Sequence, residues 1–433
     1  MSEIGKSAAE ALAYVQAVPP RQGETMIGVP FEARDEVRVG FVGVGGRGQG
    51  QVHEMLAVEG ARVTAVCDLV EAQVQRARER VEKAGQPTPA LETDWRALCE
   101  RADVDLVVIC TPWDMHVPPA LYAMECGKHA ALEVPAATTL ADCWRLVDTS
   151  ERTRRHCIQL ENCCYEFAEM MVLNMIRAGL FGRITHGEAA YIHDLRSTLL
   201  ADQAEGLWRR EPHKARNGNL YPTHGLGPLA WYMDIHRGDR FSRLVSMSSL
   251  QASLETYRDA TVASASAKRA ETYTCGDMNS SLIQTARGRT ILLQHDVVTP
   301  RPYSRINLIQ GTKGAFYDYP PRLFFDGQGH DWKPLTPEIR SQHEHPLWTK
   351  QGELARKLGG HGGMDFIMNY RLIQLYRRGL PPDIDVYDAA AWSAPGPLSD
   401  ISVAWGSMAL PFPDFTRGAW QTPTPVRASL ESV

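Results

Sequence analysis

The residues best suited to chemistry begin with closely spaced glycines, Gly43-Val44-Gly45-Gly46-Arg47-Gly48. An apolar, β-rich run from Val37 to Gly43 precedes them, and the stretch from Gly46 to Val58 is typical of a helix. Between a strand and a helix, such glycines permit a tight turn and let the backbone approach a pyrophosphate at the positive end of the helix. A turn that serves only the fold is the alternative, but this context favours phosphate binding.

A carboxylate stands where a dinucleotide needs one. Asp68 lies 20 residues after Gly48 and directly follows the strand predicted for Ala61 to Cys67. A carboxylate there accepts hydrogen bonds from the ribose 2′-hydroxyl and repels a 2′-phosphate. An ordinary surface acid is the alternative. The spacing therefore predicts NAD in preference to NADP.

Tyr221 and His224 form a second candidate group. They lie three residues apart in a stretch rich in Gly, Pro and His, Glu211 to Pro228, whose composition indicates a functional loop that leads into a helix. At that spacing both side chains can face the same side, and a neutral imidazole can take up a proton near neutral pH. A packing tyrosine and a helix-capping histidine are the alternatives.

Strands and helices alternate from Val37 to Leu160, which predicts a parallel sheet covered on both faces. Glu133 directly follows the strand predicted for Lys128 to Leu132, at the carboxyl edge where open α/β folds bind ligands, although a salt-bridged surface acid would look the same. Later segments alternate in polarity, as antiparallel strands do: Ile184 to His193, Ser242 to Leu254, Ser281 to Val298 and Arg305 to Gln310. The predicted fold is α/β, a doubly wound Rossmann domain followed by an α+β domain with an open, mainly antiparallel sheet.

Four segments follow from this pattern. We expect an N-terminal extension over residues 1–36, an NAD-binding domain over 37–160, a substrate-binding α+β domain over 161–361, and C-terminal helices over 362–433 that pack back on the first domain. The open antiparallel sheet needs a cover on one face. Pairing of copies through that face predicts a homodimer or homotetramer.

The composition limits the kinds of partner that the protein is expected to bind. The 433 residues carry a net charge of −5, with no basic run interleaved with aromatic residues, so nucleic acid is an unexpected partner. Nine scattered cysteines, the absence of a signal-like or twin-arginine start, and the absence of a long apolar stretch predict a cytoplasmic protein with reduced thiols and no membrane span. The histidines show no ligand spacing, so no metal site is expected. These histidines are His193, His213, His236, His343 and His345.

Three short motifs carry a family resemblance: Thr111-Pro112, Glu133-Val134-Pro135 and Tyr221-Pro222-Thr223-His224. With them the chain resembles the glucose-fructose oxidoreductase and inositol dehydrogenase superfamily from Val37 to about Gly406. Dehydrogenases of that superfamily carry a lysine where Val134 stands and an aspartate where Leu220 stands. The segments LEVPAA, ENCCY, WRREPH, GNLYPTHGLGP and HGGMDF instead resemble the NAD-dependent α-N-acetylgalactosaminidase-type glycosidases.

The resemblance implies a redox-assisted elimination. Bound NAD would oxidise the sugar 3-hydroxyl, a base would remove the acidified hydrogen on carbon 2, the aglycone would leave, water would add, and NADH would return the hydride. The implied catalytic residues are His224, Tyr221, Glu133 and Tyr165, and the implied sugar-binding residues are Arg209, Tyr303 and Tyr221. The predicted cofactor site comprises Gly43, Gly45, Gly46, Arg47, Gly48, Asp68, Thr111, Pro112, His116 and Glu133.

Several questions stay open at the level of the sequence. It leaves open the sugar, the aglycone, the anomeric preference, the base at carbon 2, and the choice between Arg209 and its neighbour Arg210. The alternative enzyme is a sugar or inositol dehydrogenase that releases NADH. A non-catalytic protein that only senses NAD is a third reading, and Tyr221 and His224 argue against it.

Overall fold

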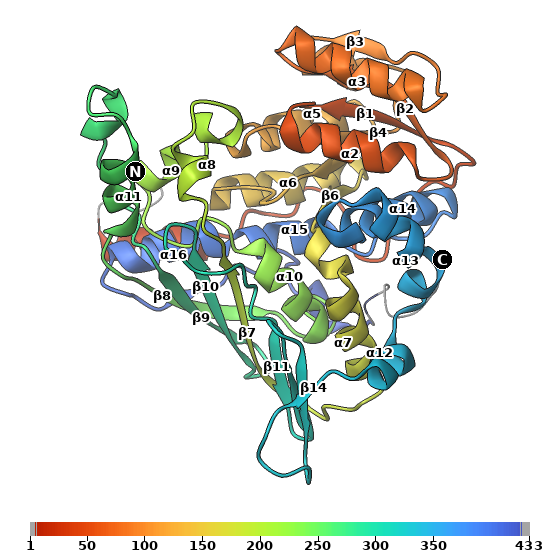
Figure 1. The fold of residues 1–433 in the computed structure, drawn as a ribbon. Coiled ribbons are helices and arrows are strands. Elements are labelled where there is room, and N and C mark those ends of the chain that lie inside the picture. The colour runs from red at the N-terminus through yellow and green to blue at the C-terminus, as the bar shows by residue number, and fades with distance from the viewer. Residues whose placement is uncertain (1–4, 6, 425, 427–433) are drawn as a thin grey trace.

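A parallel six-stranded sheet organises the first part of the chain in the computed structural model, which describes residues 5, 7–424 and 426 (Figure 1). The strand order is β3-β2-β1-β4-β5-β6. The strands are β1 (Val37–Val42), β2 (Ala61–Cys67), β3 (Ala90–Glu92), β4 (Leu106–Ile109), β5 (His129–Leu132) and β6 (Cys157–Gln159). Strands β4, β5 and β6 are buried along their whole length, as expected when helices cover both faces.

Five helices connect these strands: α2 (Gly46–Leu56), α3 (Glu71–Lys83), α4 (Trp95–Glu100), α5 (Val117–Glu125) and α6 (Leu140–Thr153). Asp94 and Thr139 cap α4 and α6 with their side-chain oxygens. The order reverses beside β1, so the loops after β1 and β4 meet at the carboxyl edge of the sheet. The predicted doubly wound Rossmann domain is confirmed.

A nine-stranded sheet organises the second part, in the order β14-β13-β12-β11-β7-β10-β9-β8-β15. Its strands are β7 (Ile184–Ile192), β8 (Phe241–Ser248), β9 (Asn279–Thr285), β10 (Thr290–Asp296), β11 (Leu308–Gly311), β12 (Gly314–Tyr317), β13 (Arg322–Phe325), β14 (Lys333–Pro334) and β15 (Leu410–Pro411). The sheet is mainly antiparallel, as predicted, but β7 and β10 run parallel. The outer face exposes Met247 and Leu282. Pairing of copies through this face stays a prediction.

Two segment predictions were wrong in detail. The alternating stretch from Ser281 to Val298 forms two strands, β9 and β10, because residues 286–289, with Gly288 at a positive φ of 82°, turn the chain back into a hairpin. The stretch from Ser242 to Leu254 ends as a strand at Ser248, and Leu254 instead lies buried in helix α11 (Ser253–Thr261). In both stretches alternation continues past a turn, so polarity alone does not mark where the strand stops.

The inner face of this sheet is covered by α10 (Thr223–Tyr232) and α16 (Pro395–Ala404), which pack on β7 and β8. Helix α14 (Met364–Arg377) packs back on α2 of the first domain, and helix α15 (Val386–Ser393) packs on α6. The remaining helices are α1 (Ala8–Gln16), α7 (Phe167–Arg177), α8 (Arg196–Leu199), α9 (Glu211–Ala215), α11 (Ser253–Thr261), α12 (Pro337–His343) and α13 (Pro346–Leu358). Helix α14 thereby reaches the carboxyl edge of the parallel sheet.

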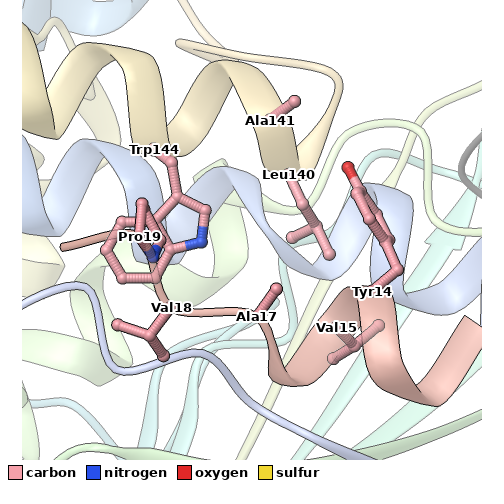
Figure 2. Close-up of a pocket in the computed structure, with 8 residues that line it drawn as sticks. All are labelled: Tyr14, Val15, Ala17, Val18, Pro19, Leu140, Ala141 and Trp144. Carbon is pink, nitrogen blue, oxygen red and sulfur yellow. The ribbon is translucent and has the colours of Figure 1, made fainter.

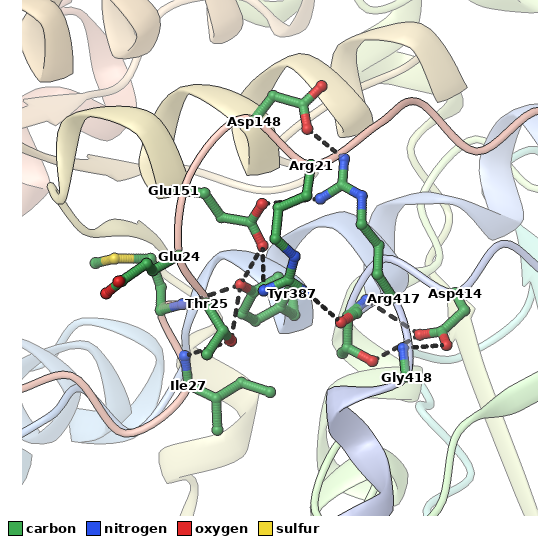
Figure 3. Close-up of polar contacts among 12 residues, drawn as sticks. Arg21, Glu24, Thr25, Ile27, Asp148, Glu151, Tyr387, Asp414, Arg417 and Gly418 are labelled. Atoms are coloured by element: carbon green, nitrogen blue, oxygen red, sulfur yellow. Dashed lines mark hydrogen bonds and ion pairs between the residues drawn. The ribbon is translucent and has the colours of Figure 1, made fainter.

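The N-terminal segment lies against helix α6. Helix α1 and the residues after it line an apolar pocket of about 270 Å³ with Leu140 and Trp144 of α6 (Figure 2). Further on, the segment is hydrogen-bonded to α15 and to residues near the C-terminal end of the chain (Figure 3). Arg21 donates to the Thr416 carbonyl at 2.8 Å, and the Met26 N–H donates to the Tyr387 hydroxyl at 3.0 Å. These bonds hold the extension as a strap between α6, α15 and residues 414–418.

Figure 3 also shows the buried carboxylate that anchors this strap. Glu151 accepts hydrogen bonds from the Tyr387 hydroxyl at 2.6 Å and from Arg417 Nη1 at 2.9 Å.

None of the described helices is long and apolar enough to cross a membrane. All nine cysteines are free thiols, and seven of them are buried.

Candidate active site

The glycine loop after β1 has the shape that a pyrophosphate needs. Gly43 has a positive φ of 84°, and a Cβ there would lie 2.9 Å from the Cys110 backbone. A Cβ at Gly48 would lie 2.0 Å from the Gly43 carbonyl oxygen, whereas a Cβ at Gly45 or Gly46 would meet nothing within 4 Å. Gly43 and Gly48 are therefore required by the turn. Gly45 and Gly46 leave open space at the N-terminus of α2, where a helix binds phosphate oxygens.

Asp68 stands at the end of β2 beside this loop. Its two carboxylate oxygens accept the N–H groups of Val44 and Val70, each at 2.9 Å. These bonds fix the carboxylate at the carboxyl edge, and each oxygen keeps a second lone pair that a ribose hydroxyl can use. The loop and Asp68 together fit a dinucleotide.

The loop after β4 is braced by a buried histidine. His116 is 1% exposed, and its two ring nitrogens lie 2.8 Å from the carbonyl oxygens of Pro135 and Thr111. Burial lowers the pKa of His116. The Thr111 hydroxyl donates to the Met115 carbonyl at 2.8 Å. The structure thus places His116 as a brace between the loops after β4 and β5, with Pro112 at the head of the braced turn.

Glu133 joins the glycine loop to the end of β5. Its Oε1 accepts from Arg47 Nε and from Gln51 Nε2, each at 2.6 Å. Arg47 continues to Asp365 of α14, where Nη1 donates to Oδ2 at 2.7 Å. The predicted cofactor residues Arg47 and Glu133 are therefore brought together at the carboxyl edge.

His224 and Tyr221 also meet, as their spacing predicted. The Tyr221 hydroxyl lies 3.3 Å from His224 Nε2, and their rings stand edge to face with centroids 4.9 Å apart. On its other side, His224 Nδ1 lies 2.7 Å from Glu161 Oε1. Leu220, four residues before His224, offers it no carboxylate, and Glu161 of the segment after β6 supplies one instead.

Glu161 is completely buried, and it also accepts the Cys163 N–H at 3.1 Å. Burial alone would raise the pKa of Glu161, but the facing His224 imidazole outweighs it and keeps this pKa below its usual range. A charged Glu161 accepts a hydrogen bond from His224 Nδ1–H, because an ionised carboxylate can only accept. That tautomer leaves the lone pair on Nε2, on the side of Tyr221.

Aromatic rings wall this cluster. Tyr191 of β7 packs on Tyr221 with centroids 4.6 Å apart and lies 6.2 Å from Tyr303, which is 38% exposed. Trp113 lies 5.6 Å from Tyr221 on another side. Such rings offer apolar faces with polar edges, which suit a sugar. Val134 belongs to the same apolar cluster and places a branched aliphatic group directly after Glu133.

The structure separates the two neighbouring arginines. The Arg209 guanidinium lies over the rings of Tyr221 and Trp113, at 4.9 and 5.3 Å from their centroids. Arg210 points elsewhere and donates to Glu271 at 2.8 Å. Arg209 is therefore the arginine that faces the His224 cluster.

Tyr165 lies apart from the other predicted residues. It ends a short 3₁₀ turn, Asn162–Tyr165, which directs its ring into the core, where the hydroxyl lies 3.2 Å from Asp383 and the ring packs against Trp231. It is 4% exposed. Tyr191 is the tyrosine that packs beside Tyr221, and a catalytic role for Tyr165 stays a prediction.

Sequence reasoning missed Glu161, Tyr191 and Trp113. Glu161 follows the end of β6 closely, much as Glu133 follows β5, so the rule that ligands bind at the carboxyl edge could have found it. Tyr191 lies in a mostly buried part of β7, where alternation gives no distinguishing signal.

Two groups of described residues have metal-ligand atoms within 4.8 Å of one another: Glu161, Cys163 and His224, and His236, Asp385 and Asp388. In the first group Glu161 already pairs with His224, and in the second Arg237 donates to both oxygens of Asp388, at 3.0 and 2.6 Å. The absence of a metal site stays a prediction.

Comparison with known proteins adds to this geometry. Residues 165–422 match the family described as glycosyl hydrolase 109, C-terminal domain, and residues 37–160 match the oxidoreductase family with an NAD-binding Rossmann fold. A glycosyl hydrolase family 109 protein of Solibacter usitatus (strain Ellin6076) is 57% identical over 409 residues, 93% of each chain. Another, from Saccharopolyspora erythraea, is 51% identical over 417 residues, 95% of this chain and 90% of its own.

Among solved structures, levoglucosan dehydrogenase in complex with NADH and levoglucosan has a TM-score of 0.68 at 18% identity, over 88% of this chain and 100% of its own. This likeness concerns the fold alone. The resemblance that the motifs indicated and the predicted fold class are confirmed, and the first domain is of a kind that binds a nicotinamide dinucleotide.

Proposed function

Since this chain belongs to glycosyl hydrolase family 109, we propose that it cleaves an α-N-acetylgalactosaminide or a related glycoside with an NAD that it keeps bound. The observation that carries the proposal is the line of Glu161, His224 and Tyr221 beside the cofactor residues, together with Val134 in place of an amine. The glycine loop, Asp68 and Glu133 would hold NAD, which would supply a reversible hydride acceptor for carbon 3 of the sugar.

His224 takes the proton of the sugar 3-hydroxyl. Its Nε2 lone pair faces the same side as the Tyr221 hydroxyl, and the charged Glu161 stabilises the imidazolium that forms. Because the pair lies 2.7 Å apart in a dry environment, this stabilisation is stronger than it would be in water. The proton returns by the same route when the sugar is reduced again.

Tyr221 donates a hydrogen bond to the oxygen on which negative charge develops. Burial raises the pKa of Tyr221 well above its ordinary value, although the nearby Arg209 opposes the rise, so the hydroxyl keeps its proton at neutral pH. A preorganised donor of this kind stabilises an enolate oxygen. Arg209 and Tyr303 at the rim bind the sugar's hydroxyl or amide oxygens through a planar guanidinium and a phenol.

The test uses purified protein, aryl α- and β-linked hexosides and N-acetylhexosaminides, and no added NAD. Aglycone release and NADH absorbance are followed together, and product formed in D₂O is examined by NMR for deuterium at carbon 2. We expect aglycone release without NADH accumulation and with deuterium incorporated. Steady NADH formation only when NAD is supplied, with no aglycone, would instead make the protein a sugar or inositol dehydrogenase.

We also propose NAD rather than NADP, a cytoplasmic location and a homodimer or homotetramer. Asp68 supports the first because its carboxylate repels a 2′-phosphate, and the nine free thiols support a reducing compartment. Mass analysis of extracted nucleotide tests the choice of NAD, and bound NADP would contradict it. Fractionation of native cells tests the location, and a secreted fraction would contradict it. Sedimentation tests the oligomeric state, and a monomer would contradict it.

A further inference from the structure

A second buried carboxylate, Asp365, lies at the carboxyl edge of the parallel sheet but outside the His224 cluster. It is 2% exposed and belongs to the first turn of α14, more than 300 residues from the glycine loop. It accepts from Arg47 Nη1 at 2.7 Å, from Asn162 Nδ2 at 2.6 Å and from His361 Nδ1 at 2.8 Å. Two distant segments, those of Arg47 and Asn162, therefore converge with the nearby His361 on one carboxylate.

The Arg47 side chain crosses the ends of the strands. It starts in the first turn of α2, directly after the glycine turn, and reaches Glu133 at the end of β5, and β4 lies between β1 and β5 in the sheet. A dinucleotide bound to this fold lies along the same carboxyl edge. Arg47 consequently lies on the face that the dinucleotide uses, with its guanidinium held at both ends by carboxylates.

A second link runs beside the first. Asn369 Nδ2 of α14 donates to Gln51 Oε1 at 2.7 Å, and Gln51 Nε2 donates to Glu133 Oε1 at 2.6 Å. Helix α14 is thus tied to Glu133 through Gln51 as well as through Arg47. A movement of α14 away from α2 breaks both links together.

The segment that leads into α14 has an unusual backbone. Gly359, Gly360, His361, Gly362 and Gly363 have consecutive positive φ angles of 94°, 44°, 49°, 75° and 104°. A Cβ at Gly360 would lie 2.3 Å from Glu54 Oε1 of α2, so the segment lies directly on that helix. His361 is the only one of the five that is not glycine, and its bond to Asp365 offsets the cost of this conformation.

We propose that Asp365 is a positioning residue that, through Arg47, clasps α14 to the glycine loop and so slows the release of the bound dinucleotide. The proposal rests on the proposed function in one respect, since a cofactor that is recycled in place must stay bound between turnovers. The clasp is defined as Arg47, Asp365 and His361. Burial disfavours a charged Asp365, but Arg47 and His361 outweigh it and hold its pKa far below the usual range.

Nucleotide exchange tests the clasp without any glycoside. Protein loaded with NAD is mixed with excess isotope-labelled NAD, and the replacement of bound by labelled nucleotide is timed by rapid gel filtration and mass spectrometry. We expect Asp365→Asn to exchange about 10-fold faster than the native chain, because an ionic hydrogen-bond set becomes a neutral one. His361→Ala, at a mostly exposed side chain, should speed exchange about threefold and covers the case in which Asp365→Asn does not fold.

Glu151→Gln is the matched control. Glu151 is also a buried carboxylate bonded to an arginine, but it anchors the N-terminal strap rather than the glycine loop. We expect this variant to lose thermal stability and to keep the native exchange rate. Native-like exchange in Asp365→Asn and His361→Ala, equal acceleration in Glu151→Gln, or exchange within the mixing time in the native chain would overturn the clasp. Aglycone release is measured separately, so failure of the clasp and failure of the proposed glycosidase activity are distinguishable.

Discussion

Asp365 and Glu161 are two buried carboxylates at the same edge of the sheet, and they differ in what they hold. Asp365 faces a guanidinium, an imidazole and an amide, and both of its oxygens are bonded. Glu161 faces one imidazole and one backbone N–H through Oε1, while its Oε2 has no hydrogen-bond partner among the described residues.

The difference concerns whether a proton can move. Asp365 is bonded to a guanidinium that stays charged at every accessible pH, so this ion pair holds its two segments together whether or not His361 is protonated. An imidazole gains and loses a proton near neutral pH, so the Glu161 cluster can transfer one. A buried carboxylate thus serves attachment at Asp365 and proton transfer at Glu161, according to the side chain that it faces.

Replacement of His224 should have the largest effect. His224→Gln keeps an amide that can donate to Glu161 but removes the group that takes the proton, so we expect kcat for aglycone release to fall about 1,000-fold. Bound NAD and the melting temperature should change little. A fall of less than tenfold, with the fold intact, would assign the proton transfer to another group.

Glu161→Gln should come next, with a fall in kcat of about 10- to 100-fold. The amide keeps the shape of the carboxylate but stabilises imidazolium poorly, so kcat should fall while KM for the glycoside stays nearly unchanged. A purely structural role would instead lower the melting temperature and change KM together with kcat. Glu151→Gln, which removes a buried charge far from His224, controls for general loss of stability.

The contact of Arg209 with the aromatic walls predicts a smaller effect on binding. Arg209→Lys keeps the charge but loses the planar group that lies over Tyr221 and Trp113, so KM should rise about 3- to 10-fold with kcat nearly unchanged. Arg210→Lys is the matched control, because Arg210 pairs with Glu271 instead. Equal effects of the two substitutions would remove Arg209 from the sugar site.

The two clusters also differ in how far the sequence could predict them. The glycine loop is contiguous, and its steric requirements are local, so Gly43, Gly48 and Asp68 were identified by spacing. Tyr221 and His224 are three residues apart, and their contact follows from the start of one helix. In these cases local geometry decides.

Glu161 and Tyr191 reach His224 from 63 and 33 residues away, and only the packing of β6, β7 and α10 brings them together. No local pattern encodes that packing. The direction of the Tyr165 ring depends on a 3₁₀ turn, and the parallel pairing of β7 with β10 depends on which strands become neighbours. Arg47 was predicted from the glycine motif, but no local pattern predicts its ion pair with Asp365, 318 residues away.

The smallest predicted effect concerns Glu54, a second carboxyl group beside Asp365 whose pKa depends on the charges around it. It lies in the last turn of α2, 3% exposed, with its Oε2 unbonded within the described part of the chain. Burial, together with the negative charge of Asp365, raises the pKa of Glu54 to about 7, although Arg47 and His361 oppose the rise. The cluster therefore holds its second carboxyl group partly protonated near neutral pH.

A carboxyl group whose pKa is raised by folding stabilises the native state at low pH and loses that contribution as the pH rises through the folded value. Glu54→Gln, which cannot ionise, should therefore gain free energy of unfolding relative to the native chain, by about 2 kcal/mol more at pH 8 than at pH 5. Denaturant unfolding at the two pH values measures the gain. Glu59→Gln, at an exposed carboxylate of the same region, should show no such trend. A gain from Glu54→Gln that is independent of pH would mean that Glu54 keeps its charge, and that the positive groups around Asp365 suffice for both acids.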